Sequence, residues 1–246
     1  MSDVALAIRQ IRYENRSFWR NPPAAFFTFA FPLIFMVVFN VLFGADAARF
    51  FTPAIIVFAV VTATFTNLAM TVAIARDQGV LKRIRGTPLP AWAYLAGRIG
   101  HVVLVAAVLV AIVATFGAVA YGVPVPWEAV PAMLVVLVVA AAAFSALGLA
   151  LAGVIPNADA APAIVNAVVL PVLFVSNVFI DMSNAPGWLD AISRVLPVRH
   201  FADAMLALYR SPGVPGVPWL EIGTIAAWGV GGVLVAIRYF GWEPRR

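Results

Sequence analysis

Charged and reactive side chains are scarce in this chain of 246 residues, of which only 11% are charged and none is cysteine. The absence of cysteine excludes disulfide bonds and thiol chemistry. Lys82 is the single lysine and follows a leucine, which excludes the phosphate-binding loop that needs lysine after glycine. His101 and His200 lie in distant regions, which argues against a histidine-based metal site. We therefore expect no catalytic centre, metal or cofactor on this chain.

Apolar sequence is what the chain has in abundance: 63% of its residues are hydrophobic and its mean hydropathy is +0.98. Soluble domains are about 45–50% apolar, so a water-soluble core cannot absorb this much apolar surface. The apolar runs do not alternate with polar residues, as barrel strands would, and they suit spanning helices of about 20 residues. The sequence predicts an all-α polytopic membrane protein with six transmembrane helices, at residues 23–44, 51–75, 99–121, 129–155, 160–180 and 218–238.

Basic residues are distributed unequally between the two sides that this arrangement defines. Twelve of the 16 lysines and arginines fall in the N-terminus, the connection between the second and third helices, and the C-terminus. The positive-inside rule therefore places both termini in the cytoplasm. The predicted helices have no charged residue near their centres, where ion-coupled transporters usually carry one. Transport by this chain would draw its energy from elsewhere.

Two segments outside the predicted spans have helical patterns. Residues 1–21 place Ile8 and Ile11 on one face and arginines on another, up to a break at two prolines. This segment is either an N-terminal interfacial amphipathic helix whose arginines reach lipid phosphates, or a basic leader that only sets topology. Residues 181–217 are predicted to form short helices in the outer segment, which dip into the outer leaflet or make a small extracellular cap.

The loop at residues 76–98 combines basic residues with a compact apolar strip. Val80, Leu81 and Ile84 repeat at helical spacing beside Lys82 and Arg83. A solvated basic loop that merely fixes topology would explain the charges. The apolar strip has no role in such a loop, and it favours a short helix that docks against another surface.

Mildly polar and small residues occur inside the predicted spans. Thr64, Asn67 and Thr71 share one face of the second helix, where they would form interhelical hydrogen bonds or contact a substrate. Ala227 and Gly231 lie four residues apart in the sixth helix, a spacing that permits close helix packing.

Two longer motifs carry a resemblance to a known family. The first is the loop Arg76-Asp77-x-Gly79-x-Leu81-x-Arg83-x-Arg85-x-x-Pro88-Leu89. The second comprises Asn166, Leu170-Pro171, Phe174-Val175-Ser176, Val178-Phe179, Pro186-x-Trp188-Leu189, Leu196-Pro197, and His200 with Asp203. In this order, over nearly the whole chain, they resemble the ABC type-2 permease family, the membrane subunits of bacterial ABC exporters of the daunorubicin-resistance and nodulation-export kind.

This resemblance implies a single ABC type-2 transmembrane domain over residues 1–246 and a coupling helix in the 76–98 loop. In the family, that helix docks on a separate ATPase subunit, which binds the ATP and Mg. The residues expected to couple to the ATPase are Arg76, Asp77, Gly79, Val80, Leu81, Arg83, Ile84, Arg85 and Pro88. Of these, Leu81 and Ile84 would fill an apolar groove on the ATPase, and the arginines would meet its acidic or polar groups.

The chain departs from the family pattern near the outer end of the fifth helix. Asn177 stands where the family usually has glycine, and Asp181 where it usually has proline. The substrate therefore stays open. The candidates for a substrate path or gate are Asn67, Thr71, Asn166, Ser176, Asn177, Phe179 and Asp181.

The function expected from these features is that of a permease subunit of an ATP-driven ABC exporter in the bacterial plasma (inner) membrane. Its substrate would be a hydrophobic or amphiphilic drug, lipid or lipid-linked glycan. Its partners would be an ABC ATPase, a second permease copy or paralogue and membrane lipid, without nucleic acid. One alternative is an ATP-independent channel or secondary transporter. Another is an intramembrane enzyme acting on lipids, which would need converging acidic or histidine residues that the sequence does not show.

Overall fold

The computed structural model describes residues 3–86, 91–180, 182, 185–210 and 216–241. The regular secondary structure in these ranges is entirely helical, which confirms the predicted all-α class. The helices are α1 (Asp3–Trp19), α2 (Pro22–Phe43), η1 (Ala45–Ala47), α3 (Ala48–Val61), η2 (Thr62–Thr66), α4 (Asn67–Asp77), α5 (Val80–Arg85), α6 (Ala91–Tyr121), η3 (Trp127–Ala129), α7 (Val130–Val154), α8 (Ala161–Phe174), α9 (Gly187–Ser193), α10 (Pro197–Arg210) and α11 (Trp219–Tyr239).

Five helical segments within the described ranges are long and apolar enough to cross a membrane. They are Ala25–Phe43, Ala48–Asp77, Trp92–Tyr121, Trp127–Val154 and Trp219–Tyr239. The second of these runs through α3, η2 and α4 as one continuous helix, and η2 within it is a π-helix. Spanning segments therefore occur at five of the six positions that the sequence predicts.

The helix at the remaining position is shorter than predicted. α8 ends at Phe174 rather than Ile180, and its 14 residues extend about 21 Å, less than the roughly 30 Å hydrocarbon core of a bilayer. Two residues explain the early end. Pro171 lies inside α8 and cannot donate a backbone hydrogen bond, and Asn177 follows with a left-handed φ of +62°. A left-handed residue cannot continue a right-handed helix.

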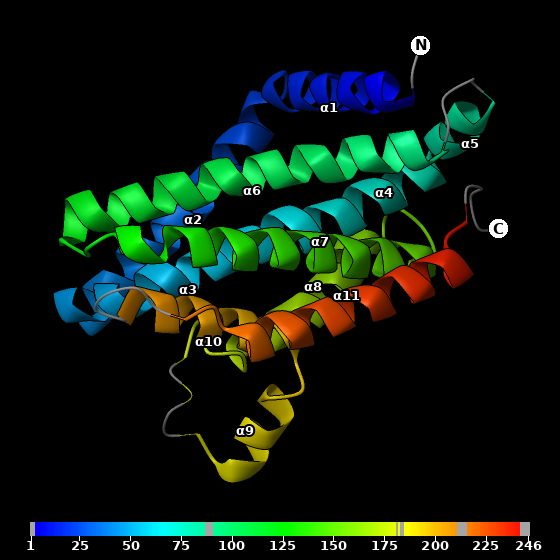
Figure 1. Cartoon of the computed structure of the whole chain (residues 1–246). Coiled ribbons are helices and arrows are strands. Elements are labelled where there is room, and N and C mark those ends of the chain that lie inside the picture. Colours follow the sequence, from blue (N-terminus) through cyan, green and yellow to red (C-terminus); the bar gives the residue numbers. More distant parts are fainter. Residues whose placement is uncertain (1–2, 87–90, 181, 183–184, 211–215, 242–246) are drawn as a thin grey trace.

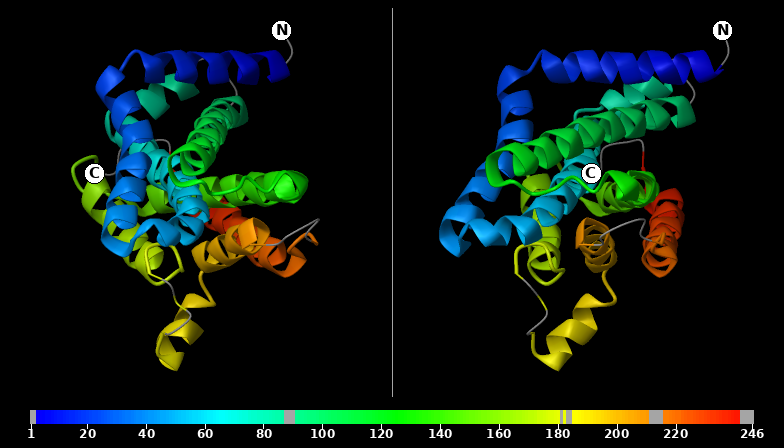
Figure 2. Two further views of the ribbon diagram at one scale, coloured as in Figure 1. Left: turned by 90° about the vertical axis from the view of Figure 1, so that its left-hand side faces the viewer. Right: turned by 60° about the vertical axis from the view of Figure 1, so that its left-hand side comes forward.

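The helices α6, α7 and α11 run lengthwise through the bundle, with α1 along one side of it and α9 projecting from the opposite side (Figure 1). The further views in Figure 2 keep α1 and α9 on opposite sides of the bundle. α7 packs against α4 and α11, so it is central to the bundle. Its buried residues Val136, Ala140 and Phe144 join a core to which α3, α6 and α10 also contribute.

Close packing between α7 and α11 depends on glycines other than the predicted one. A Cβ placed on Gly231 would meet nothing within 4 Å, and Ala227 is exposed, so the predicted pair does not form this contact. Gly232 faces α7 instead, where a Cβ would lie 2.9 Å from the backbone nitrogen of Leu147. Gly229 makes a similar approach to Ala143, at 2.8 Å. Spacing in the sequence indicated small residues, but the rotation of α11 decides which of them face α7.

The predicted N-terminal helix is present as α1 and packs against the first part of α6. A Cβ on Gly97 of α6 would lie 2.2 Å from Cγ of Gln10, so these helices approach closely at that glycine. Arg98 of α6 forms an ion pair with Glu14 of α1, with 3.5 Å between Nε and Oε1. Ile8 faces away from α6 and is 60% exposed. The side of α1 that contacts the bundle is therefore partly polar.

Two short helices occupy the segment before α11, as predicted. α10 begins at Pro197, a residue that suits the first turn of a helix. It packs between α3 and α11, with Phe201 and Met205 fully buried. α9 lies outside this packing and leaves Trp188 and Ile192 exposed. Only the second of the two helices is thus part of the bundle core.

Candidate functional site

The turn between α4 and α5 is set by Gly79. Its φ of +69° is left-handed, and a Cβ there would meet nothing within 4 Å. Glycine is therefore favoured for backbone conformation rather than for space. The carbonyl of Gly79 accepts a hydrogen bond from the N–H of Arg83, which starts α5. This turn places a short basic helix at the end of the long α3–α4 segment.

Two predicted coupling residues fasten α4 to the end of α7 and to the connection that follows it. Arg76 is 1% exposed, and its Nη1 donates to the carbonyl of Ala152 at 2.7 Å. Its Nη2 donates to the carbonyl of Ile155. Asp77 accepts a hydrogen bond from the N–H of Ala158 at 3.0 Å. Within this chain, Arg76 is thus enclosed by the bundle rather than presented to a partner.

α5 presents its basic side outward and its apolar side inward. Leu81 is 0% exposed and joins a small core with Leu68 and Tyr94. Lys82 and Arg83 are exposed. The structure therefore differs from the expectation that Leu81 fills a groove on a partner, because α4 and α6 already cover it. Val80 and Ile84 are partly buried against the same core, whereas the side chain of Arg85, and Pro88, lie outside the described residues.

A cavity of about 620 Å³ lies between α1, α2, the α3–α4 segment and α6. Two of the predicted path residues, Asn67 and Thr71, line it. Its other lining residues include Glu14, Asn21, Phe27, Phe31, Phe58, Thr62, Thr66, Arg98, His101 and Leu109. The π-helix Thr62–Thr66 forms part of its wall, and single π-turns inside α-helices are frequent at functional sites. The sequence did not indicate this cavity, because four helical segments, from different parts of the chain, enclose it.

The other predicted path residues lie elsewhere. Asn166 is exposed on α8. Ser176 is 0% exposed, and Phe179 stacks against Phe35 with ring centroids 5.6 Å apart. Asp181 lies outside the described residues. These residues therefore do not form one site with Asn67 and Thr71.

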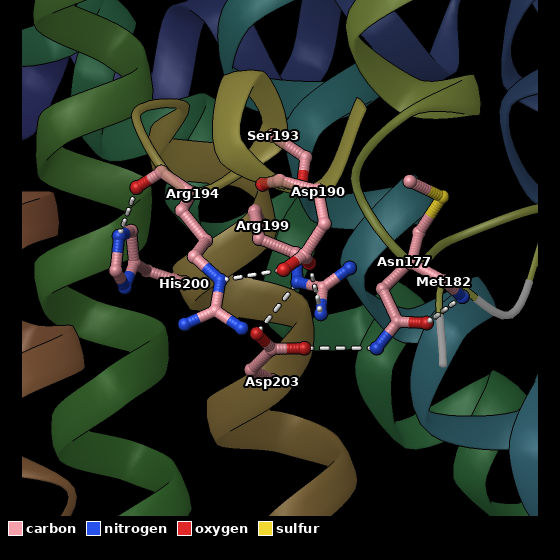
Figure 3. Close-up of polar contacts among 8 residues, drawn as sticks. All are labelled: Asn177, Met182, Asp190, Ser193, Arg194, Arg199, His200 and Asp203. Atoms are coloured by element: carbon pink, nitrogen blue, oxygen red, sulfur yellow. Dashed lines mark hydrogen bonds and ion pairs between the residues drawn. The ribbon is translucent and has the colours of Figure 1, made fainter. Parts of the chain in front are cut away.

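Asn177 belongs to a polar network with residues of α9 and α10 (Figure 3). Its Oδ1 accepts a hydrogen bond from the N–H of Met182 at 3.1 Å. Its Nδ2 donates to Oδ1 of Asp203 on α10 at 2.8 Å. The side chain of Asn177 thus links the chain that follows α8 to α10.

Ion pairs extend this network to α9. Arg199 on α10 donates from Nε to Asp203 at 2.7 Å, and its Nη2 lies 3.7 Å from Oδ1 of Asp190 on α9. Asp190 also pairs with Arg194, at 2.8 Å (Figure 3). Burial raises the pKa of Tyr209 on α10 to about 12. The network joins the chain that follows α8 to α9 and α10.

Five apolar segments of spanning length, with a short basic helix at one end, define an integral membrane protein. Residues 6–209 match the family model for the ABC-2 type transporter, and the chain belongs to this family. A relative described as daunorubicin resistance ABC transporter permease protein DrrB1, from Streptomyces coeruleorubidus, is 32% identical over 221 residues, 82% of this chain and 70% of the relative.

A second relative is the probable multidrug ABC transporter permease YbhR of Escherichia coli (strain K12). It is 23% identical over 174 residues, which are 71% of this chain and 47% of the relative. The aligned part of the chain thus spans about half the length of this relative and 70% of the first. Both relatives are ABC transporter permeases, which confirms the family that the two sequence motifs resemble.

Proposed function

We propose that this chain is the permease subunit of an ATP-driven exporter that moves a hydrophobic or amphiphilic substrate out of the cytoplasm or inner leaflet. A separate ABC ATPase would bind the ATP and Mg. Membership of the ABC-2 family and similarity to permeases named for daunorubicin resistance and multidrug transport support this proposal. The same similarity supports a location in the bacterial inner membrane.

The observation that carries this proposal is the attachment of α5 to the spanning helices. Lys82 and Arg83 face outward, while Leu81 is enclosed beside α4 and α6. Arg76 then joins α4 to the α7–α8 connection through buried hydrogen bonds. An ATPase that pushed on the outer side of α5 would therefore move α4 and α7 with it. Buried contacts would transmit the movement, and exposed cations would bind the ATPase.

The topology of this proposal has six spans, with α8 as the fifth. α8 and the turns up to Ile180 would together reach across the bilayer. The termini and α5 would lie in the cytoplasm, with α1 in the interface. Ile8, Tyr13 and Trp19 are exposed apolar or aromatic residues on α1, and Arg12 and Arg16 are exposed among them. This mixture suits the boundary between lipid tails and phosphates.

The coupling role of α5 predicts that charge reversal at Lys82 and Arg83 separates the chain from its ATPase. We expect the Lys82→Glu, Arg83→Glu double variant to recover at least tenfold less ATPase on affinity purification in mild detergent, because like charges would face each other at the contact. Arg16→Glu is the matched control, since Arg16 is exposed on α1. Equal ATPase recovery and unchanged transport in the double variant would contradict the role of α5.

A second permease copy is the partner that best explains why the polar side chain of Asn166 is exposed on α8. This amide is exposed on an apolar helix, where lipid cannot satisfy its hydrogen bonds. Because the chain has no cysteine, Asn166→Cys can form a disulfide only with another molecule. We expect oxidation in membranes to give a covalent dimer. Val119→Cys, at a position 82% exposed on α6, controls for random collision, and equal cross-linking of both variants would contradict a contact at Asn166.

The channel or secondary transporter remains the rival function. It predicts transport by the chain alone in reconstituted vesicles, unaffected by vanadate. Export that requires the ATPase and stops with vanadate is the result expected from an ABC permease.

A further inference from the structure

The cavity between α1, α2, α4 and α6 has a polar end and an apolar end. The polar part of its wall includes Asn67, the first residue of α4, and the ion pair between Glu14 and Arg98. The apolar part of its wall includes Phe58 of α3 and Leu109 of α6, which are 4% and 2% exposed. From Phe58 to Ile74, these helices extend about 24 Å along their axis. One ligand that reached both ends would need an apolar body and a polar head group.

The cavity adjoins the outer surface of α2. Phe27 and Phe31 both line it, and they are 61% and 45% exposed. The same side chains thus belong to the cavity wall and to the apolar outer face of α2. An amphiphile dissolved in the bilayer could enter between α2 and α4 without passing through water.

Two polar atoms beside the cavity have no hydrogen-bond partner within the described part of the chain. They are Oγ1 of Thr66 and Nδ1 of His101, a residue that is 8% exposed. Thr64 differs, because its hydroxyl donates to the carbonyl four residues earlier, at 2.7 Å. The corresponding carbonyl for Thr66 is that of Thr62, which accepts the N–H of Asn67 in the π-helix. Thr66, the last residue of the π-helix, therefore has an unbonded hydroxyl beside the cavity within the described part of the chain.

Side-chain rotations of Thr66 and His101 would turn Oγ1 and Nδ1 towards a ligand in the cavity. Threonine in a helix occupies two χ1 rotamers, which exchange its hydroxyl with other positions around Cβ. A ring flip of His101 exchanges Nδ1 with a carbon, without backbone movement. Thr66, His101 and the amide of Asn67 can each donate a hydrogen bond. Glu14 offsets the charge of Arg98, so the head group need not be an anion.

We propose that this cavity binds one amphiphile whose head group carries acceptor oxygens, held near Thr66, Asn67 and His101, with its apolar body along Phe31 and Phe58. The volume of about 620 Å³ lies in the range of sites for single small molecules. The assignment of this site as the loading position for export from the inner leaflet rests on the proposed function. Binding itself does not, because it requires neither ATPase nor transport.

Photolabelling of the full chain in lipid nanodiscs tests this site. The probes are a monoacylglycerol and an n-alkane that carry the same diazirine group, and labelled peptides are identified by mass spectrometry. We expect the monoacylglycerol to label peptides of α2 and α4 at the cavity in a saturable manner. The Thr66→Val, Asn67→Leu double variant should reduce this labelling about tenfold, because two donors are lost. Labelling by the alkane should not change.

Two further variants keep the result interpretable. Thr64→Val removes a threonine hydroxyl from the same helix but outside the cavity lining, and should label like the unaltered chain. Thr71→Trp fills the cavity from an exposed position on α4 and should abolish labelling by both probes there. Equal monoacylglycerol labelling in the Thr66→Val, Asn67→Leu variant, or labelling restricted to lipid-facing residues such as Val119, would overturn the proposal.

A third probe separates membrane lipid from other amphiphiles, because phospholipid head groups also carry acceptor oxygens. The same diazirine on a diacyl phosphatidylethanolamine should label the cavity if membrane lipid occupies it. Labelling by the monoacylglycerol alone identifies a single-chain occupant. Cavity labelling combined with transport that needs no ATPase would support the binding site while contradicting the proposed function.

Discussion

Asn177 illustrates how one residue decides where a helix ends. Its φ of +62° makes it the one non-glycine residue with positive φ in the described part of the chain. Asparagine tolerates this conformation better than most residues, which explains how it can replace the glycine usual in the family. Unlike glycine, it also bonds to Met182 and Asp203. The departure from the family pattern therefore keeps the turn and adds a link to α10.

Substitutions of Asn177 should separate these two contributions. Asn177→Gly keeps the left-handed turn and loses the side-chain hydrogen bonds, whereas Asn177→Ala loses the bonds and strains the backbone. We expect the alanine variant to be about 1–2 kcal/mol less stable than the glycine variant. Thermal unfolding in detergent, followed by tryptophan fluorescence, measures the order. A glycine variant less stable than the alanine variant would show that backbone strain is not the deciding factor.

At the scale of elements, the bundle depends on close contact between α7 and α11. Gly232 approaches the backbone of α7, which cannot move aside as a flexible side chain could. Gly231, its neighbour in sequence, faces open space. The two glycines therefore differ in their contacts although they share a helix and a residue type.

This difference predicts that valine is tolerated at one glycine and not at the other. Gly232→Val should destabilise the bundle by about 1–3 kcal/mol, because the added atoms overlap the α7 backbone. Gly231→Val should leave stability nearly unchanged and serves as the matched control. The melting temperatures of the purified proteins provide the comparison. Similar losses in both variants would show that the close approach of Gly232 to α7 is not the deciding factor.

At the scale of the whole molecule, the topology is defined by the side of the membrane on which each connection between helices lies. Two connections and α9 offer exposed positions: Gln78 between α4 and α5, Glu128 between α6 and α7, and Ala191 on α9. Because the chain lacks cysteine, each can receive a unique thiol. A shorter α8 makes Ala191 the decisive position, since its side depends on whether the segment from α8 to Ile180 crosses the bilayer.

The six-span topology with cytoplasmic termini predicts a specific labelling pattern. In intact cells, a membrane-impermeant maleimide should label Glu128→Cys and Ala191→Cys. It should label Gln78→Cys only after the membrane is permeabilised. Labelling of Ala191→Cys only in permeabilised cells would show that α8 does not cross, and would leave five spans.

The sequence by itself determined the class of protein and the approximate positions of the long helices. Apolar content and the lengths of the uncharged runs suffice for this, because a bilayer favours helices of fixed minimum length. The two motifs also indicated the ABC-2 family, which the family match confirms. Both conclusions depend only on local composition and on the order of motifs along the chain.

Only the tertiary structure decided which side of each helix is enclosed. Arg76 and Leu81 belong to the same motif as Lys82 and Arg83, yet the first two are buried and the last two exposed. The cavity arises because α1, α2, α4 and α6 meet, and the π-helix that lines it has no simple sequence signal. The physical reason is that helix rotation is set by contacts between segments far apart in the chain. Spacing within one segment cannot specify those contacts.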